Sequence, residues 1–191
     1  MASQHSVSAP TTPVMSMSEF IGGGAGRNNV SPCPYCNMYG TETHSFNEIA
    51  RTSKFGRIMY TCAANAKDYS NTKAITTHIS TYLDGEKMLP WTWVFDCRGL
   101  KTKHTLQIDL SITLSRMIQD KYSENLQMIY ILNPTIGVDT LLTHIMPIFK
   151  RDSLQYLRKL KGSPLEIYME LKKDNMEEPG IQAIMDKLRI S

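Results

Sequence analysis

Cys33 and Cys36 form the pair whose spacing is most suggestive of chemistry in this 191-residue chain. Two intervening residues let both thiolates reach one ion in a tight knuckle, which is half of a tetrahedral zinc site. A full site needs two more ligands, and His44 and Cys62 are the nearest candidates. The same spacing occurs in redox motifs at a strand-to-helix junction. Zinc binding, redox chemistry and two reduced cysteines in a loop remain the three interpretations.

A second candidate group is Asp96, Cys97 and His104, at and after the end of an aromatic segment. Cysteine and histidine can serve as nucleophile and base, but the sequence supplies no third group to orient them. It also contains no P-loop, no nucleophile elbow, and no dinucleotide-binding glycine fingerprint that follows a strand. We therefore expect a protein that is not an enzyme and that has no catalytic residues.

Basic residues gather in two places next to strongly apolar segments. Such an arrangement suits an anionic membrane surface, where each basic residue contributes roughly 1 kcal/mol, although an ordinary solvated face is the alternative. A net charge of +3 and the lack of a recognition motif argue against nucleic acid as a partner. The two groups are Arg98, Lys101, Lys103 and His104, and Lys150, Arg151, Arg158, Lys159 and Lys161.

The composition is that of a globular domain with an appendage. Hydrophobic residues make up 41% and charged residues 20%, so wholesale disorder is not expected. Four cysteines are too few for a disulfide-rich secreted scaffold. No apolar run reaches the 18 or so residues of a membrane span, and no basic stretch followed by an apolar run suggests a secretory signal. We expect a cytoplasmic protein with reduced thiols.

The hydrophobic periodicity predicts alternating strands and helices. Such alternation with long crossovers indicates an α/β fold, with a mostly parallel sheet flanked by helices. Residues 154–160 are ambiguous between helix and strand. Expected strands are 58–63, 91–97 and 128–132, and expected helices are 71–83, 104–121, 137–149, 164–173 and 179–189.

Six segments, in order, resemble motifs of the CRAL-TRIO family of lipid-binding domains, over about residues 56–173. The resemblance implies an apolar pocket on the sheet, closed by a gate helix at 137–149. It also implies binding or transfer of a phospholipid or another hydrophobic ligand at a membrane surface, with the protein peripheral there. The segments are Gly56-Arg57-Ile58-Met59-Tyr60, Trp93 to Leu100, Asp120 to Leu126, Ile129 to Asn133, Met146-Pro147-Ile148-Phe149 and Leu160-Lys161-Gly162-Ser163.

We divide the chain accordingly into a flexible, disordered Ser/Thr/Pro/Gly-rich tail at 1–31, a Cys-x-x-Cys element with linker at 32–55, and the lipid-binding domain at 56–191. Apolar side chains of two strands and the gate helix are expected to line the pocket, with a few polar residues near its mouth. The expected ligand-binding residues are Trp93, Phe95, Tyr130, Leu132, Leu141, Leu142, Ile145, Phe149, Lys101, His104, Glu124 and Asn125.

The sequence also departs from the family pattern. The family's N-terminal helical subdomain is replaced by the tail and the cysteine element, and Asn125 stands where phosphatidylinositol-binding members have arginine. Leu157 stands where they have lysine. The alternative function is therefore an interaction or structural adaptor on the same fold, with a protein partner at the N-terminal tail. Its pocket would have collapsed around large side chains: Trp91, Trp93, Met128 and Tyr130.

Overall fold

The computed structural model describes residues 33–38, 44–67, 69–149 and 155–190. All of them belong to one of the two compact units of the chain, Ser31–Ser191. Within these described ranges, five strands form a single sheet in the order β1-β2-β3-β4-β5, the same order as in the sequence. The predicted tail at 1–31 lies outside the described residues, as do Lys150 and Arg151.

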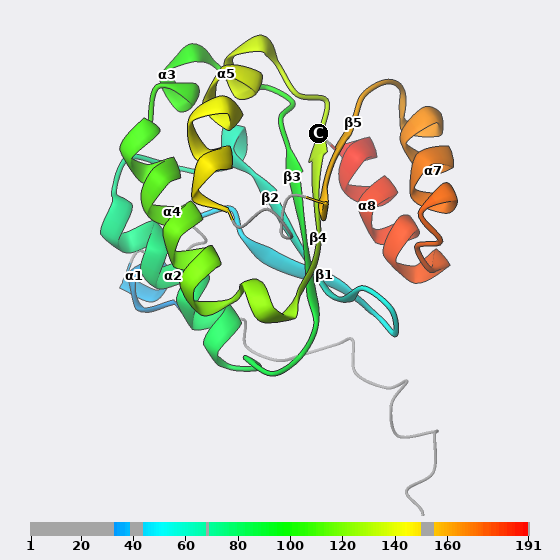
Figure 1. Ribbon diagram of the computed structural model, residues 1–191, viewed down its shortest axis with the longest axis horizontal. Helices are drawn as coiled ribbons and strands as arrows, with labels where there is room; N and C mark the ends of the chain where they lie inside the picture. Colours follow the sequence, from blue (N-terminus) through cyan, green and yellow to red (C-terminus); the bar gives the residue numbers. More distant parts are fainter. Residues whose placement is uncertain (1–32, 39–43, 68, 150–154, 191) are drawn as a thin grey trace, which may run out of the picture. The chain divides into compact units, whose positions relative to one another are not determined.

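Strands β2 to β5 are parallel and are joined by helical crossovers (Figure 1). Sequential parallel strands with right-handed crossovers place all of the connecting helices on one face of the sheet. The strands are β2 (Gly56–Cys62), β3 (Trp91–Asp96), β4 (Leu126–Leu132) and β5 (Leu157–Leu160). The helices between them are α2 (Thr72–Asp84), α3 (Thr102–Thr105), α4 (Ile108–Lys121) and α5 (Ile136–Ile145). The α/β fold class predicted from the sequence is confirmed.

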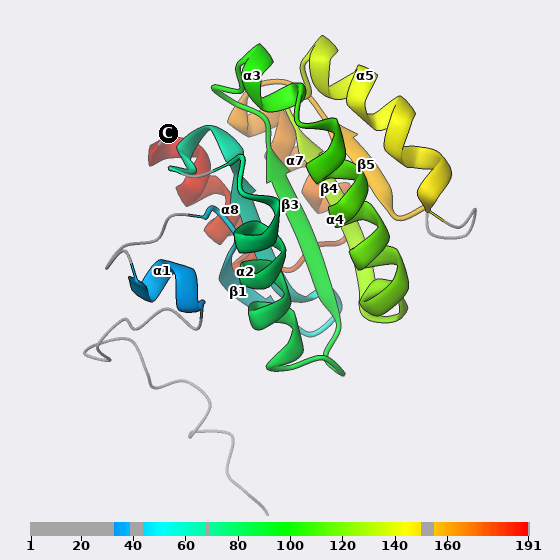
Figure 2. The same cartoon turned by 90° about the vertical axis from the view of Figure 1, so that its left-hand side faces the viewer.

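The opposite face of the sheet is covered by α7 (Pro164–Lys173) and α8 (Glu178–Ile190), as Figures 1 and 2 show. Ser163 begins α7 with a capping box, because its side chain and that of Glu166 satisfy each other's backbone amides.

Because helices cover both faces of the sheet, alternate residues of the strands enter two separate cores. Val94 and Tyr130 pack with α7 and α8, whereas Met59, Ile129 and Ile131 pack with α2, α4 and α5.

Two elements near the start of the described chain are not among the predicted ones. Strand β1 (Asn47–Thr52) pairs antiparallel with β2 at the edge of the sheet. Gly56 ends the turn between them with φ 66, a left-handed conformation that favours glycine. The short helix α1 (Pro34–Met38) contains Cys36 and packs on α2. The sheet thus extends into the segment predicted as a linker.

Two predicted helices are interrupted. The one expected at 104–121 is divided into α3 and α4, because Gln107 has a non-helical ψ of 58. Leu106 consequently lies outside the apolar face and is 67% exposed. The one expected at 137–149 ends as α5 at Ile145, and Pro147 lies in the 3-10 turn Met146–Ile148. The segment that was ambiguous at 154–160 contains β5.

None of the helices in the described residues is both long enough and apolar enough to cross a bilayer.

Candidate functional site

An apolar cavity of about 180 Å³ lies between the sheet and helices α2, α4 and α5. The strands supply its floor, because the odd-numbered residues of β3 and β4 face these helices: Trp93, Phe95, Ile129 and Ile131. Parallel strands covered on both faces are mostly apolar, and no Asp, Glu, Lys or Arg lines this cavity in the described residues. The cavity has the character of a site for hydrocarbon.

Six of the twelve expected ligand-binding residues are apolar and line this cavity. Trp93 and Phe95 do so from β3, and Leu141, Leu142 and Ile145 do so from α5. Phe149 follows α5 and is nearly buried. The structure therefore brings the predicted strand and gate-helix residues together around one space.

Tyr130 and Leu132 are on the other face of β4. Both are fully buried in the core with α7 and α8, and the Tyr130 hydroxyl donates a hydrogen bond to Asp174 at 3.1 Å. Side chains alternate along a strand, so residues next to Ile129 and Ile131 must point away from the cavity. These two expected residues do not line the cavity.

The four expected polar residues are divided between the two ends of the sheet. His104 lines the cavity, and its Nδ1 accepts a hydrogen bond from the Lys101 amide at 3.0 Å. Lys101 itself is exposed and precedes α3. Glu124 and Asn125 immediately precede β4, at its amino end, and the Asn125 amide donates to the carbonyl of Lys87. Lys101, Glu124 and Asn125 are not among the cavity-lining residues.

The large side chains that would fill a collapsed pocket are distributed over both cores. Trp91 is buried next to Trp93, and its indole donates to the carbonyl of Tyr122 at 3.0 Å. Tyr130 and Met128 pack on the side of α7 and α8. Only Trp93 of these four lines the cavity, and it leaves the space open.

Helices α2 and α4 supply cavity residues that are not among the expected ones. Ile75 and Ile79 come from α2, and Leu110, Leu114 and Ser115 come from α4. Their helical spacing is visible in the sequence. The apolar stripe of each helix shows which of its residues are buried. It does not show whether they face a pocket or a core, because both carry the same pattern.

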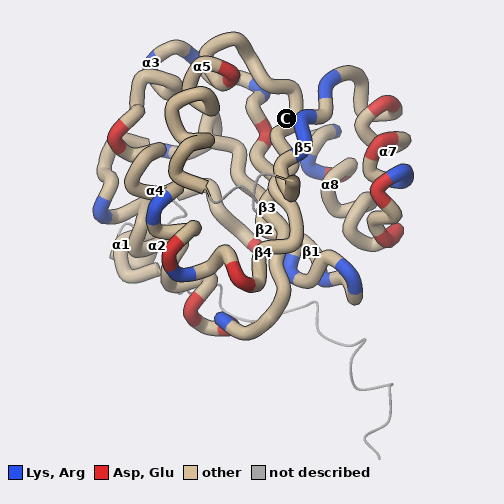
Figure 3. The backbone as a smooth tube through the Cα atoms, in the orientation of Figure 1, with Lys and Arg blue, Asp and Glu red and all other residues tan. Residues whose placement is uncertain are grey.

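The basic residues predicted to face an anionic surface have several different partners. Arg98 pairs with the buried Asp96 and donates to carbonyls of α8. Arg158 pairs with Asp174, and Lys159 pairs with Asp139 of α5. Lys101 and Lys103 are exposed at α3. Figure 3 shows these basic positions as blue segments at α3 and along β5.

Two large apolar side chains are exposed near these α3 lysines. Leu106 directly follows α3, and Ile136, which begins α5, is 87% exposed. The two helices touch, because Gly137 packs against Thr105. The edge formed by α3 and the start of α5 thus combines exposed apolar groups with lysines, next to cavity-lining residues.

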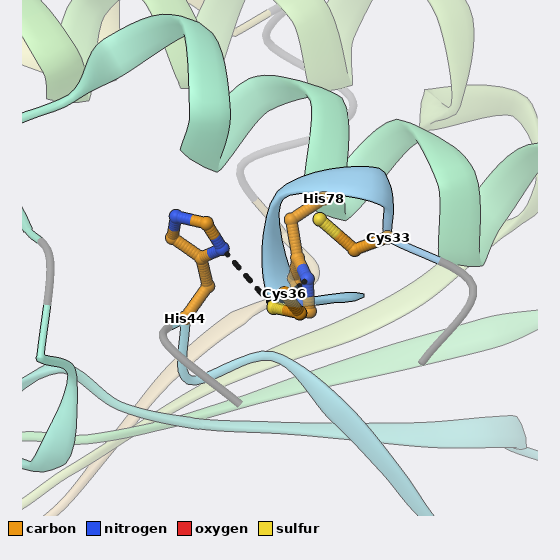
Figure 4. A group of neighbouring side chains, drawn as sticks. All are labelled: Cys33, Cys36, His44 and His78. Carbon is orange, nitrogen blue, oxygen red and sulfur yellow. Dashed lines mark hydrogen bonds between the residues drawn. The ribbon is translucent and has the colours of Figure 1, made fainter. Parts of the chain in front are cut away.

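The cysteine pair lies in a buried cluster with two histidines, shown in Figure 4. One ligand atom from each of the four residues lies within 4.8 Å of every other. The predicted candidate His44 belongs to this cluster, and His78 on α2 is a member that the sequence analysis missed. Cys62 does not belong to it, because it packs in the core with α7 and α8. The members are Cys33, Cys36, His44 and His78.

Burial shifts the pKa of two members of this cluster. It lowers the pKa of His78 to about 4, and it raises the pKa of the Cys33 thiol. The imidazole of His78 is therefore neutral at physiological pH, the form in which histidine binds metals. The donor set is compatible with a metal ion.

Cys97 lacks the environment of a nucleophile. Burial, followed by the charge of Asp96, raises its pKa to about 12, whereas reactive cysteines have lowered values. His104 packs its ring against Tyr69 and has its Nδ1 engaged by the backbone. The two residues have separate surroundings, so the geometry gives no support to a cysteine–histidine site.

Comparisons with known proteins give one family and a set of solved structures. The family described as "Divergent CRAL/TRIO domain" matches residues 56–180. Nineteen chains of solved structures match. One of them, titled "Crystal structure of Sfh5", has 16% sequence identity and a TM-score of 0.47. That match covers 61% of this chain and 46% of the other, so it spans less than half of the other chain. A search of curated proteins gives no match.

Proposed function

Because the chain belongs to the divergent CRAL/TRIO domain family, a family of lipid-binding domains, we propose that it holds a hydrophobic ligand in the cavity beneath α5 without transforming it. The observation that carries this proposal is the apolar cavity itself, floored by Trp93, Phe95, Ile129 and Ile131. Burying hydrocarbon is favourable by about 0.8 kcal/mol for each CH₂ group. An acyl chain can therefore be retained by the cavity without a charged or catalytic group.

The size of the cavity restricts how such a ligand enters. An apolar cavity of about 150 Å³ takes up a molecule such as benzene, and pockets for drug-sized ligands measure about 300–1,000 Å³. The space of about 180 Å³ thus accommodates a short segment of one hydrocarbon chain. A whole phospholipid requires the cavity to widen.

We propose that α5 and the turn after it act as the gate that widens it. Only Val138 and Leu142 of α5 are buried, and an exposed ion pair between Asp139 and Lys159 connects this helix to β5. Exposed ion pairs contribute little to stability, typically about 0–1 kcal/mol. Helix α5 can therefore move at a lower cost than the strands beneath it.

A membrane surface is the proposed place of ligand exchange, with the protein cytoplasmic and peripheral. The supporting feature is the edge of α3 and α5, where Leu106 and Ile136 are exposed beside Lys101 and Lys103. Apolar groups inserted into the headgroup region and lysines next to anionic lipids favour reversible binding together. Cys62 and Cys97 are free thiols, which fits a reducing compartment.

Ligand binding is tested by uptake of lipid from liposomes, followed by native mass spectrometry of the re-isolated protein. Ser111→Phe places a large ring at a cavity-lining position of α4, where the Ser111 hydroxyl donates to the carbonyl of Gln107, the residue before this helix. Thr113→Phe adds the same ring at an exposed position of the same helix and is the matched control. We expect wild type and Thr113→Phe to carry lipid and Ser111→Phe to carry at least about ten-fold less, a loss of roughly 1.4 kcal/mol.

Two results would refute ligand binding in this cavity. One is wild-type protein that takes up no lipid from liposomes of any composition, which would favour the adaptor alternative. The other is equal uptake by Ser111→Phe and Thr113→Phe, which would place the ligand elsewhere on the protein. Circular dichroism of both variants verifies that their folds are intact.

Membrane docking has its own test, which is sedimentation with vesicles that contain anionic lipid. Leu106→Asp and Ile136→Asp should each weaken binding several-fold, because they replace inserted apolar groups with charge. Leu165→Asp is the matched control, since Leu165 is also 67% exposed but lies on α7, on the other face of the sheet. Equal losses in all three variants would argue against docking through the α3 and α5 edge.

A further inference from the structure

We propose a structural Zn²⁺ site that fastens α1 and the segment before β1 to helix α2, with four ligands: Cys33, Cys36, His44 and His78. The four come from three separate parts of the chain, and Cys36 and His78 are 42 positions apart. The fold, rather than a local motif, assembles the donor set.

The distances around Cys36 are those of adjacent ligands on one ion. Its Sγ lies 3.5 Å from Nδ1 of His44 and 3.5 Å from Nδ1 of His78. In a tetrahedral site with Zn–S of about 2.3 Å and Zn–N of about 2.0–2.1 Å, sulfur and nitrogen stand roughly 3.5 Å apart. The widest separation among the four ligand atoms, at most 4.8 Å, requires only a small contraction around the ion.

His78 is oriented as a metal-binding histidine. Its Nε2 lies 2.9 Å from the carbonyl oxygen of Phe46, which can only accept a hydrogen bond. Nε2 therefore carries the proton, and the lone pair of the neutral ring is at Nδ1, facing Cys36. A backbone carbonyl that fixes the tautomer in this way is the usual outer partner of a metal-bound histidine.

The chemistry of the set favours zinc in a structural role. Two thiolates and two neutral imidazoles balance the charge of Zn²⁺, so the complete site is neutral and suits its buried position. Tetrahedral sulfur and nitrogen donors are typical of zinc. Four protein ligands leave no position for water or substrate, which is the arrangement of structural sites rather than catalytic ones.

The location of the site gives the ion a specific task. Phe46 follows His44 closely and packs against Trp93, a residue of the cavity floor. His44 and His78 themselves belong to the lining of the cavity. The ion therefore secures one wall of the cavity.

The test is metal analysis of the full chain, purified with a reductant and free of lipid. We expect about one Zn²⁺ per chain by inductively coupled plasma mass spectrometry. Substitution with Co²⁺ should give the visible absorption of a tetrahedral ion together with thiolate-to-cobalt charge transfer. Zn²⁺ should also raise the midpoint of thermal unfolding, because it binds the folded state.

Variants assign the ligands. Cys36→Ser and His78→Asn should each weaken Zn²⁺ binding by more than about 100-fold, since losing even an outer partner costs about 10–100-fold. The matched controls are Cys62→Ser, Cys97→Ser and His104→Asn, which change the same residue types outside the cluster. These controls should retain the full complement of metal.

Several outcomes would overturn the proposal. They are wild-type protein that takes up no Zn²⁺ after reconstitution, a Cys33–Cys36 disulfide in protein purified with the reductant, or unchanged binding in Cys36→Ser and His78→Asn. Should these variants fail to fold, the Co²⁺ spectrum of wild type decides, because a spectrum without thiolate charge transfer excludes the cysteines as ligands. None of these measurements involves lipid, so their failure is distinct from failure of the proposed function.

Discussion

Arg98 neutralises the fully buried carboxylate of Asp96, with Nη2 2.7 Å from Oδ2. Another nitrogen of the same guanidinium donates to the carbonyl of Leu188 at 2.5 Å. Asp96 ends the central strand β3, and Leu188 lies in the last turns of α8. This ion pair therefore joins the middle of the sheet to the C-terminal helix.

Arg98→Met should destabilise the protein by about 3 kcal/mol, because it leaves a buried carboxylate without its counter-charge. The measurement is urea denaturation followed by circular dichroism. Arg189→Met is the control, since Arg189 pairs with Asp186 at 3.8 Å on the exposed side of α8 and should cost less than about 1 kcal/mol. Equal losses in the two variants would contradict the role of the buried pair.

Gly56→Ala should destabilise the protein by about 3 kcal/mol or more. A Cβ at this position would lie 1.9 Å from the carbonyl oxygen of Pro90, and the backbone φ is positive. Backbone strain and overpacking each cost about 1–3 kcal/mol. The control is Gly85→Ala, because Gly85 has φ −59 and a Cβ added there would lie 3.7 Å from its nearest neighbour, the carbonyl oxygen of Thr81. Thermal unfolding compares the two, and a stable Gly56→Ala protein would contradict the structure of this turn.

Gly137→Ala should loosen α5 and release bound lipid about five-fold faster. A Cβ added at Gly137 would lie 2.9 Å from Oγ1 of Thr105. Such a close contact costs about 1 kcal/mol, which corresponds to a factor of about five in the rate of release. Thr105→Ala removes the two nearest atoms, Oγ1 and Cγ2, so the double variant should recover the slower release. Stopped-flow transfer of a fluorescent lipid to acceptor vesicles measures the rates. Release that stays fast in the double variant would mean that contact with α3 does not control the gate.

Cys97 should resist alkylation in the native protein. Burial raises its pKa to about 12, so at pH 8 only about one molecule in 10⁴ carries the reactive thiolate. Iodoacetamide followed by peptide mass spectrometry should find Cys97 unlabelled in buffer and fully labelled in urea. Rapid labelling in buffer would contradict this prediction and make Cys97 a candidate nucleophile again.

The sequence predicts elements best where burial imposes a pattern. The aromatic run of β3 and the apolar stripe of α2 correspond to expected elements because each faces a core. Strand β1 carries polar residues at a half-exposed sheet edge, so no pattern reveals it, and it forms by pairing with β2. The interruption at Gln107 is equally invisible, because tertiary contacts override local propensity.

The site was harder to predict for a related reason. A strand buried on both faces carries apolar residues on both of them, so the sequence cannot distinguish Tyr130, which faces α7 and α8, from Ile129, which faces the cavity. His78 lies on the buried face of α2 among core residues, and only the fold brings it to Cys36.

The strictly sequential strand order has a consequence for biosynthesis. All crossover helices in the described chain lie on one side of the sheet, and the other side is covered by α7 and α8, which follow all of these strands in the sequence. Until α7 and α8 have been synthesised, the nascent chain therefore exposes Ile58, Val94 and Tyr130 to solvent as an apolar surface. Chaperone capture and aggregation of ribosome-bound chains should both be greatest just before α7 emerges.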